Sequence, residues 1–415
     1  MSTIDLKNPN NLRVANQLRV IEALRNKPET CPALAKALSL SGVAIKHITD
    51  ELLKENIIVS YGIKSPKNRG RKATLLSLNN DVGVLCAIDL SGRDLAVAIT
   101  DVSNNIIVED AAKNILYIDD EALEKVAQIA KNLLSSPLVK KRKLLGICVS
   151  TPGEFDNVTY DFIYAPRYVG TINNIKRFFE DRFQVEVNIY NDINLGLLGE
   201  QRYGSIPNSA NDVYFVFLDY VAGSSLLLNG KIFEGARGHA GEPASYPKDN
   251  EFTKNLFSGR FYTINDIYAY IHEHAKDYPN EPFYLTDPFS FEQIATKYKE
   301  GDPLISEAIE YSAKINAIQL IAVSNLLDLE YICLEGKMLE LGATYTDLII
   351  HYFRKYDANH TRAQILFSSL DSAANMLGAI YQASNMYFLN LFAMLAAKRT
   401  NSSDHDIKTF FGNNI

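Results

Sequence analysis

Apolar residues recur at helical spacing near the start of the chain, and this spacing predicts helices there. Four of them fall on one face of a helix over residues 11–27: Leu12, Val20, Ile21 and Leu24. The stretch CPALAKAL at residues 31–38 predicts a short second helix. The pattern resumes a few residues later, so a compact helical module is expected at this end.

A third helix is predicted to begin after Ser41, whose hydroxyl is suited to cap the first turn. The segment GVAIKHITDELLK is expected to place these apolar residues on one face: Val43, Ile48 and Leu52. Its basic residues lie elsewhere on the helix: Lys46, His47 and Lys54. Two short helices joined by a tight turn, the second with exposed basic residues, are typical of a helix-turn-helix.

Two apolar stretches, residues 57–63 and 73–78, predict a pair of strands after these helices. Between them, KSPKNRGRK combines five basic residues with Gly and Pro. Such a loop is typical of the wing of a winged helix, where arginine suits the negative potential of a DNA minor groove. The residues expected to contact DNA are therefore Ser41, Lys46, His47, Lys67, Arg69, Arg71 and Lys72.

Charge is distributed unevenly along the chain. Residues 1–79 hold 13 Lys and Arg against 6 Asp and Glu, a net charge of +7, and the other residues hold 29 against 43, a net charge of −14. A basic head on an acidic body favours a DNA-binding module attached to another domain. The alternative is a protein-interaction module with a solvated basic loop.

From residue 80 onward, strand clusters alternate with helices. VGVLCAIDLSGRDLAVAITDVSNNII predicts three strands with a turn at residues 89–92, and EALEKVAQIAKNLL predicts a helix. Further on, strands are expected at residues 213–218 and 225–229, joined by a turn at 219–224. This alternation predicts an α/β fold class for the body.

The composition is that of an ordinary globular protein, with 47% hydrophobic and 22% charged residues in 415. The sequence has no apolar run of about 20 residues and no signal-peptide pattern at its start, so a cytoplasmic location without membrane contact is expected. The four cysteines lie far apart in apolar stretches and form no CxxC pattern, which favours buried reduced thiols.

The order of motifs resembles the ROK family, which contains sugar kinases and transcriptional repressors of sugar metabolism. The wing Gly-Arg followed by TLLSLN is similar to that of the repressor branch. AIDLSGRD resembles the first phosphate loop and DYVAGSS the second, while IYNDINLGLLGE resembles the segment that holds the catalytic aspartate. GARGHAGEPASYP resembles the sugar and zinc segment, and ICLEGKMLELG the nucleotide-side loop.

The resemblance implies a winged helix-turn-helix followed by two actin-like (ribonuclease H-like) α/β lobes of a sugar-kinase fold. The boundaries expected from it are 1–79 for the winged helix and 80–195 for the first lobe, completed by a helix at about 384–400. Residues 196–383 are expected to form the second lobe, with the ligand cleft and an oligomerisation surface. The family further implies a homodimer or tetramer that binds a double-stranded DNA operator.

Departures from the family pattern argue against ATP and zinc as cofactors. The first phosphate loop ends Ser-Gly-Arg-Asp instead of Gly-Gly-Thr-Lys, and Asp219, Tyr220 and Val221 replace Gly-Thr-Gly in the second. A carboxylate next to a triphosphate is repulsive. The family's zinc histidine is replaced by Ser245, and the cysteines of its zinc cluster have no counterpart in residues 246–257.

The sugar side keeps more of the pattern, and its ligand-contacting candidates are Ser91, Gly92, Arg167, Asn191, Asp192, Glu242 and Ser245. In active kinases of the family the residue matching Asp192 is the base, so Asp192 is expected to be a vestigial base that still binds a sugar hydroxyl. Arg167 stands where the family has Asn, and it would pair either with an acidic or phosphorylated sugar or with a carboxylate such as Asp161. For Asn191 and Asp192 the alternative is a strand-end Asx turn.

These observations favour a transcriptional repressor of carbohydrate genes that senses a sugar, sugar phosphate or sugar acid with a catalytically inactive kinase-like domain. One alternative is an active sugar kinase with a regulatory head. The other is a DNA-binding scaffold that responds to no ligand.

Overall fold

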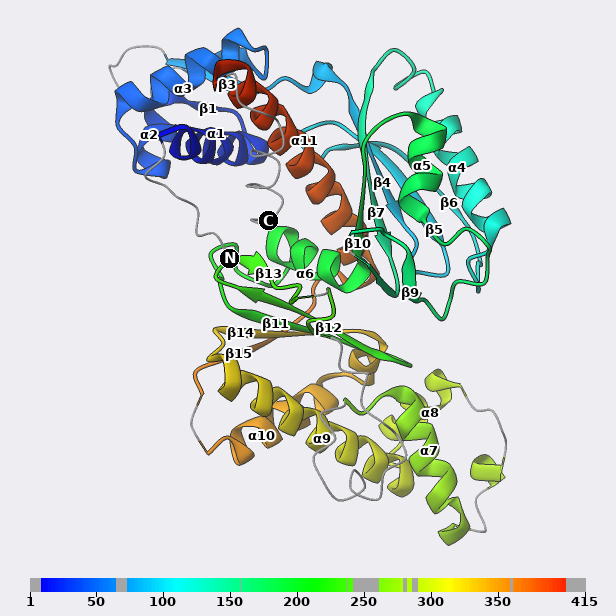
Figure 1. Cartoon of the computed structure of the whole chain (residues 1–415). Coiled ribbons are helices and arrows are strands. Elements are labelled where there is room, and N and C mark those ends of the chain that lie inside the picture. Colours follow the sequence, from blue (N-terminus) through cyan, green and yellow to red (C-terminus); the bar gives the residue numbers. More distant parts are fainter. Residues whose placement is uncertain are drawn as a thin grey trace. The chain divides into compact units, whose positions relative to one another are not determined.

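The computed structural model describes residues 9–64, 73–156, 158–236, 238–241, 261–278, 282–285, 290–358 and 361–400 (Figure 1). The described residues form two compact units. The first comprises residues 9–153, 160–190 and those from 379 onward, and the second comprises residues 154–159 and 191–378. In the part that the structure describes, no helix combines the length and the apolar character needed to cross a membrane.

The head of the first unit is a winged helix-turn-helix, as the sequence predicts. Its elements, in chain order, are α1 (Pro9–Asn26), β1 (Glu29–Thr30), α2 (Cys31–Leu38), α3 (Gly42–Lys54), β2 (Ile58–Lys64) and β3 (Ala73–Leu78). The strands form a sheet in the order β1-β3-β2, with β2 and β3 antiparallel. The loop between β2 and β3, which is the predicted wing, lies outside the described residues.

The head is held together by one apolar face from each helix. Its buried residues include Val20, Ile21, Leu24, Leu34, Ile45, Ile48 and Leu52. Two residues predicted to face inward do not, since Leu12 is 46% exposed and Val43 is 82% exposed. In α3 the inner face consists of positions 45, 48, 49 and 52, which share one side of a helix of 3.6 residues per turn, so position 43 is turned outward.

The first unit also contains a mixed five-stranded sheet in the order β10-β7-β4-β5-β6. Its strands and the neighbouring segments are η1 (Asn80–Val82), β4 (Val84–Asp89), β5 (Leu95–Thr100), β6 (Ile106–Ala112), α4 (Asp120–Leu134), β7 (Leu144–Thr151), β9 (Phe162–Tyr164), α5 (Ile175–Phe183) and β10 (Val187–Asn191). Every residue of β4 is buried, because it pairs with β5 on one side and with β7 on the other.

The second unit has its own mixed sheet in the order β13-β12-β11-β14-β15. Its elements are β8 (Glu154–Phe155), α6 (Asp192–Tyr203), β11 (Val213–Leu218), β12 (Ala222–Leu228), β13 (Lys231–Ile232), α7 (Ile264–His274), η3 (Ala275–Asp277), η4 (Pro282–Leu285), α8 (Phe291–Lys299), α9 (Pro303–Leu327), β14 (Tyr331–Glu335), η5 (Lys337–Leu341), α10 (Ala343–Tyr356), β15 (Gln364–Phe367) and η6 (Asp371–Ala373). Helices α7, α8, α9 and α10 bury their apolar faces together with this sheet (Figure 1).

The turn between β11 and β12 is shorter than the sequence suggests. The predicted turn covers residues 219–224, but the antiparallel ladder runs on to the pair Leu218 and Ala222. Only Asp219, Tyr220 and Val221 therefore lie between the paired residues. Small residues such as Ala222 and Gly223 fit into a strand as readily as into a loop, so the sequence pattern does not locate this boundary.

The last described helix, α11 (Ala374–Thr400), contributes residues to both units. At its start it packs without clearance on α6. A Cβ atom added at Gly378 would fall on the carbonyl oxygen of Leu195, and one added at Gly199 would fall on the carbonyl oxygen of Ala374. Glycine is therefore required where these two helices cross.

The observed architecture confirms the predicted fold class: a winged helix followed by two α/β lobes, each with a mixed sheet. The exact boundaries at 79, 195 and 383 stay a prediction. In the contact-based division the head is grouped with the first lobe, and the second unit begins its main segment at residue 191.

Candidate functional site

Helix α3 is positioned by the tight turn that precedes it. Helix α2 ends at Ser39, which adopts a left-handed conformation with φ of 54°. Ser41 then caps α3, because its Oγ accepts a hydrogen bond from the amide of Ala44 at 3.1 Å. Inside the helix, Thr49 is buried and its hydroxyl donates to the carbonyl of Ile45 at 3.0 Å. The sequence thus fixes both the start of α3 and the side that faces the core.

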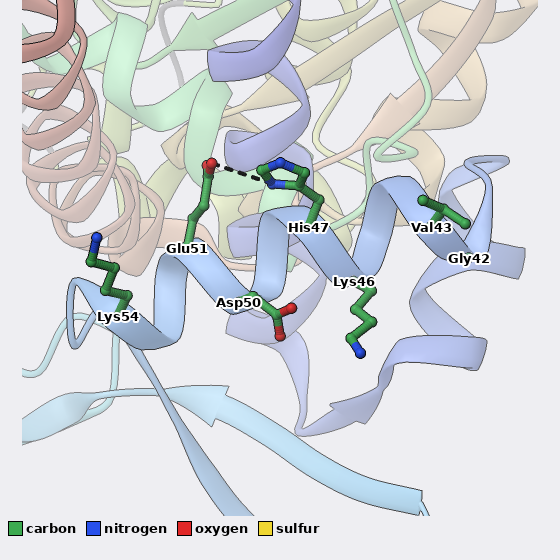
Figure 2. Close-up of a pocket in the computed structure, with 7 residues that line it drawn as sticks. All are labelled: Gly42, Val43, Lys46, His47, Asp50, Glu51 and Lys54. Carbon is green, nitrogen blue, oxygen red and sulfur yellow. Dashed lines mark ion pairs between the residues drawn. The ribbon is translucent and has the colours of Figure 1, made fainter.

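The outer side of α3 forms a continuous exposed stripe, which we call the α3 stripe and define as Gly42, Val43, Lys46, His47, Asp50 and Lys54. With Glu51 these residues line a shallow hollow of about 510 Å³ (Figure 2). In Figure 2, Lys46 and Asp50 project to the same side of the helix. The stripe combines cationic, anionic and apolar groups within three helical turns.

Glu51 links α3 to α1. Its carboxylate accepts hydrogen bonds from Nε of Arg13 at 3.0 Å and from Nε2 of Gln17 at 3.2 Å. It also lies 3.3 Å from Nδ1 of His47, one turn earlier on α3. The side chain of Glu51 is 16% exposed and that of His47 is 73% exposed. Glu51 therefore orients the imidazole of His47 from behind and leaves the ring in solvent.

The structure brings together three of the predicted DNA contacts, since Ser41 caps α3 and both Lys46 and His47 belong to the α3 stripe. The others, Lys67, Arg69, Arg71 and Lys72, lie outside the described residues. Sequence reasoning missed Val43 and Asp50. Both could have been found from spacing alone, because positions 43, 46, 47, 50 and 54 complement the buried set of α3.

In the body, the loop after β4 is held by its own side chains. Asp89 is buried, and its Oδ1 accepts from the amide of Ser91 at 3.0 Å and from the Ser91 hydroxyl at 2.7 Å. Burial raises the pKa of Asp89, while the hydrogen bonds from Ser91 act in the opposite direction. The Ser91 and Gly92 segment is thus a tight, internally bonded turn.

Arg167 fastens this loop to the chain after β6. Its guanidinium donates to the carbonyl oxygen of Gly92 at 2.9 Å and to that of Ile115 at 3.1 Å. Further acceptors are the carbonyls of Leu116 and Leu90, each at 3.4 Å, and that of Ser91. These acceptors are backbone carbonyls, and the positive charge of Arg167 also acts to lower the pKa of the buried Asp89 carboxyl. Arg167 as a ligand contact stays a prediction.

Asn191 and Asp192 form the start of α6 in the second unit. Oδ1 of Asn191 caps the helix by accepting from the amides of Ile193 at 2.9 Å and Asn194 at 3.2 Å. Oδ1 of Asp192 accepts from the amide of Ile193 at 3.0 Å. The capping role is the Asx geometry that the sequence left as an alternative, and a helix N-terminus favours the negative charge of Asp192. A ligand role for these residues stays a prediction.

The segment GHAG, at residues 238–241, lies in the same unit. Nδ1 of His239 pairs with a carboxylate oxygen of Glu154 at 2.7 Å, and the hydroxyl of Ser224 donates to the carbonyl of Gly241. Gly241 has φ of 89°, and a Cβ there would lie 2.7 Å from the carbonyl oxygen of Ser224. Sequence reasoning missed the pair of Glu154 and His239, although His239 stands inside the motif GARGHAGEPASYP. Glu242 and Ser245 lie outside the described residues.

Two amides of the turn after β11 are hydrogen-bonded within the turn itself. The amide of Asp219 donates to the carbonyl of Val221 at 3.0 Å, and the amide of Tyr220 donates to the Asp219 carboxylate at 2.7 Å. Desolvation raises the pKa of Asp219. Phosphate loops bind anions with outward backbone amides, so a turn with these bonds and a carboxylate is unsuited to a triphosphate.

A hollow of about 690 Å³ lies at the carboxyl ends of β11, β14 and β15. Its lining includes four acidic residues and one lysine: Asp219, Glu335, Glu340, Asp371 and Lys337. The lysine is already bound, since its Nζ lies 2.7 Å from the Glu292 carboxylate. Open α/β sheets bind ligands at this edge, and the acidic lining disfavours an anionic one.

Metal-ligating side chains do not gather into a metal site in the described part of the chain. There, no group of three or more His, Cys, Asp and Glu residues has a geometry that could hold a metal ion. His274 stacks on Tyr270 with 4.1 Å between ring centroids. The described cysteines Cys86, Cys148 and Cys333 are buried, and Cys31 is half-buried.

Comparison with known proteins identifies a matching family model and several similar sequences. A family model described as "ROK family" matches residues 85–247. The xylose repressor of Caldicellulosiruptor bescii is 28% identical over 234 residues, which cover 56% of this chain and 58% of that repressor. The chain therefore spans less than two thirds of the length of this curated relative.

Solved structures show the same fold. A ROK family transcriptional regulator, described as a homolog of the E. coli MLC protein, superposes with a TM-score of 0.74 at 19% identity over 93% of this chain and 99% of its own. A ROK hexokinase from Thermus thermophilus superposes with a TM-score of 0.60 at 17% identity, over 73% of this chain and 98% of its own.

Proposed function

Because the chain belongs to the ROK family, we propose that it is a DNA-binding transcriptional repressor whose ROK lobes bind a sugar or sugar derivative as effector. One observation carries this proposal: the capped helix α3 presents the α3 stripe outward from a winged-helix head. A helix with exposed basic residues after a tight turn is the element that enters the major groove in this class of module. The partner is a double-stranded operator.

The charge of the head supports this partner. Residues 1–79 carry a net charge of +7, and 13 Lys and Arg supply the electrostatic attraction that DNA phosphates require. Operators of such proteins consist of two half-sites, which match a homodimer or a tetramer built from dimers. A protein-interaction module would have the same fold, but it would not require exposed cationic groups on α3.

The effector site is proposed at the polar candidates of the sugar side. Asn191 and Asp192 supply an amide and a carboxylate at a helix start, a combination suited to sugar hydroxyls. Ser91, Gly92 and Arg167 are proposed as further contacts, with Glu242 and Ser245 outside the described residues. Relatives named xylose repressors make xylose the first compound to test.

A catalytic role is disfavoured by the nucleotide side. The amides of Asp219 and Tyr220 are hydrogen-bonded within their own turn, and the hollow beside them has four acidic residues in its lining. Each of these features opposes binding of a triphosphate. We therefore propose that the protein changes its affinity for DNA when it binds its effector and does not phosphorylate that effector.

Fluorescence anisotropy tests the proposal directly. Purified protein is titrated onto DNA from upstream of its own gene and neighbouring genes, with and without xylose, other sugars, sugar phosphates and sugar acids. Tight binding that falls with salt and that one compound weakens is the expected result. Absence of sequence-specific binding to any fragment contradicts a repressor, and binding that no compound changes supports the ligand-independent scaffold.

A second candidate function is an active sugar kinase, favoured by Asp192 at the position of the family's catalytic base. A coupled assay of ADP release over the same sugars separates the two functions. Turnover with any sugar that is lost in Asp192→Ala would establish the kinase.

A further inference from the structure

Two residues of the α3 stripe have no affinity for phosphate, and the inference drawn from them rests on the proposed function. Val43 is apolar and 82% exposed, and Asp50 is an exposed anion. Neither contributes to the core of the head, whose α3 contacts come from Ile45, Ile48 and Leu52. Phosphate binding alone would favour polar or basic residues at both positions.

Asp50 differs from the other acid of α3. Glu51 is 16% exposed and is held by Arg13 and Gln17 of α1, so it acts as a brace for His47. Asp50 lies on the outer surface, on the same side of the helix as Lys46 (Figure 2). A carboxylate on a surface that approaches DNA is repelled by phosphates unless a hydrogen-bond donor meets it.

The major groove offers a partner for each of these residues. The C5 methyl group of thymine is its apolar feature, and small aliphatic side chains contact it. The exocyclic amino group of cytosine is a donor that aspartate accepts. Adenine presents an amino donor next to its N7 acceptor, which repels a carboxylate, whereas guanine and thymine present only acceptors in this groove. The basic residues around them, Lys46, His47 and Lys54, supply the attraction that brings the stripe to the groove.

We propose that α3 reads base edges through these two residues, with Val43 against a thymine methyl group and Asp50 accepting a hydrogen bond from a cytosine amino group. Asp50 acts also as a discriminator, because guanine or thymine at its position would face a carboxylate without a donor. Asp50 follows Val43 by seven positions, which corresponds to about 10 Å along a helix. If base pairs follow one another every 3.4 Å or so along a strand, the thymine and the cytosine lie about three steps apart in each half-site.

The test begins with in vitro selection of the full chain from a random duplex library. Affinities for the selected site are then compared among the wild type, Val43→Ala and Asp50→Ala. Replacing the selected thymine by deoxyuridine removes only the methyl group, and it is expected to weaken the wild type by roughly five-fold. Val43→Ala should bind both sites equally, and Asp50→Ala should select sites in which the cytosine is no longer preferred.

Matched controls come from the end of α3 and from its C-cap residue, Glu55. Leu53→Ala removes another exposed apolar side chain, and Glu55→Ala removes another exposed acid, and neither residue lines the stripe's hollow in the described structure. Both control variants should keep the wild-type consensus and the wild-type sensitivity to the methyl group. Thermal unfolding of all variants is measured to check that each one is folded.

Two results would overturn the proposed base contacts of Val43 and Asp50 while leaving the proposed repressor function intact. One is a Val43→Ala variant that still distinguishes thymine from deoxyuridine as the wild type does. The other is an Asp50→Ala variant that selects an unchanged site. Selection of no sequence by the wild type would overturn the proposed repressor function and the readout together.

Discussion

The guanidinium of Arg25 in α1 lies over the ring of Tyr381 in α11, with 5.0 Å between its central carbon and the ring centroid. The ring of Phe388, two turns further along α11, lies 5.8 Å from the same carbon. The side chain of Arg25 is only 5% exposed and pairs with Glu22. A helix of the winged-helix head is thus attached to the last described helix of the chain by a desolvated cation on aromatic rings.

Arg25→Met should destabilise the protein by about 2 kcal/mol, because it removes the cation–π contacts and leaves Glu22 without this partner. Chemical denaturation measures the change. Arg177→Met is the matched control, since Arg177 is 81% exposed and pairs within its own helix, and it should change stability little. Equal stability of the two variants would show that the contact with α11 is unimportant for the fold.

Gly378→Ala should destabilise the protein by about 1–3 kcal/mol, because its Cβ would meet the backbone of Leu195 and neither helix can yield locally. Gly42→Ala serves as control, since a Cβ there meets no atom of the described residues within 4 Å. Alanine at that helical position should be neutral or slightly stabilising. A tolerated Gly378→Ala would mean that α6 and α11 can move apart at no cost.

Asp192→Ala is expected to abolish the response of DNA binding to the effector, because the variant lacks the carboxylate proposed to bind a sugar hydroxyl. Affinity for the operator without effector should not change. Asp192→Asn retains an acceptor and should keep part of the response. Anisotropy titrations with operator and effector check this, and a full response in Asp192→Ala would remove this residue from the site.

Lys46→Ala should weaken binding to all DNA sequences and lower the slope of log K against log salt by about 0.9, the value for one lost phosphate contact. Arg71→Ala, in the predicted wing, should act in the same way. Lys131→Ala, an exposed lysine of α4 in the body, is the control and should leave the slope unchanged. A wild-type slope in Lys46→Ala would place this lysine away from the phosphates.

Asp89, at the end of β4, and Asp94, in the turn after it, should affect the pH dependence of stability in opposite directions. Burial raises the pKa of Asp89, and a raised pKa contributes stability below the unfolded value of about 3.8 that is lost as pH rises. The amide of Asn114 and the side chain of Lys113 lower the pKa of Asp94, so its contribution is present above about 3.8 and is lost as pH falls.

Denaturation of both asparagine variants between pH 3 and pH 7 tests the sign. Asp89→Asn should gain stability relative to the wild type as pH rises, and Asp94→Asn should lose it. Parallel curves for the two variants would contradict the assigned environments. The contrast is sharp because the two residues are close in sequence and differ chiefly in burial.

Local patterns allowed much of the fold to be predicted. Helices in the head followed from 3.6-residue spacing, the cap at Ser41 from its hydroxyl, and the alternation of strands and helices in the body from apolar runs. Val43 was assigned to the wrong face because a β-branched residue suits the core, and its exposure depends on where the helix phase begins. The turn at 219–221 was predicted too long because small residues fit both strands and loops.

The contacts of the candidate site were harder to predict. Arg167 binds carbonyls that are about 50 and 75 positions away in sequence, and backbone acceptors leave no trace in residue identity. The pair of His239 and Glu154 likewise joins distant segments. Motifs identified which segments matter, but only the tertiary structure shows which partner each side chain takes.

The unbroken helix α11 has a consequence for how the protein can be dissected. Its first residues are counted with the second unit and the rest with the first, with no loop between the two portions. A fragment that stops at residue 190 would therefore omit the helix on which Arg25 packs. If the head and the first lobe are expressed without the second unit, α11 has to be added, either as a separate peptide or by fusion after β10. Co-expressed fragments split in a surface loop of the second unit would preserve it, which makes this chain better suited to complementation than to truncation.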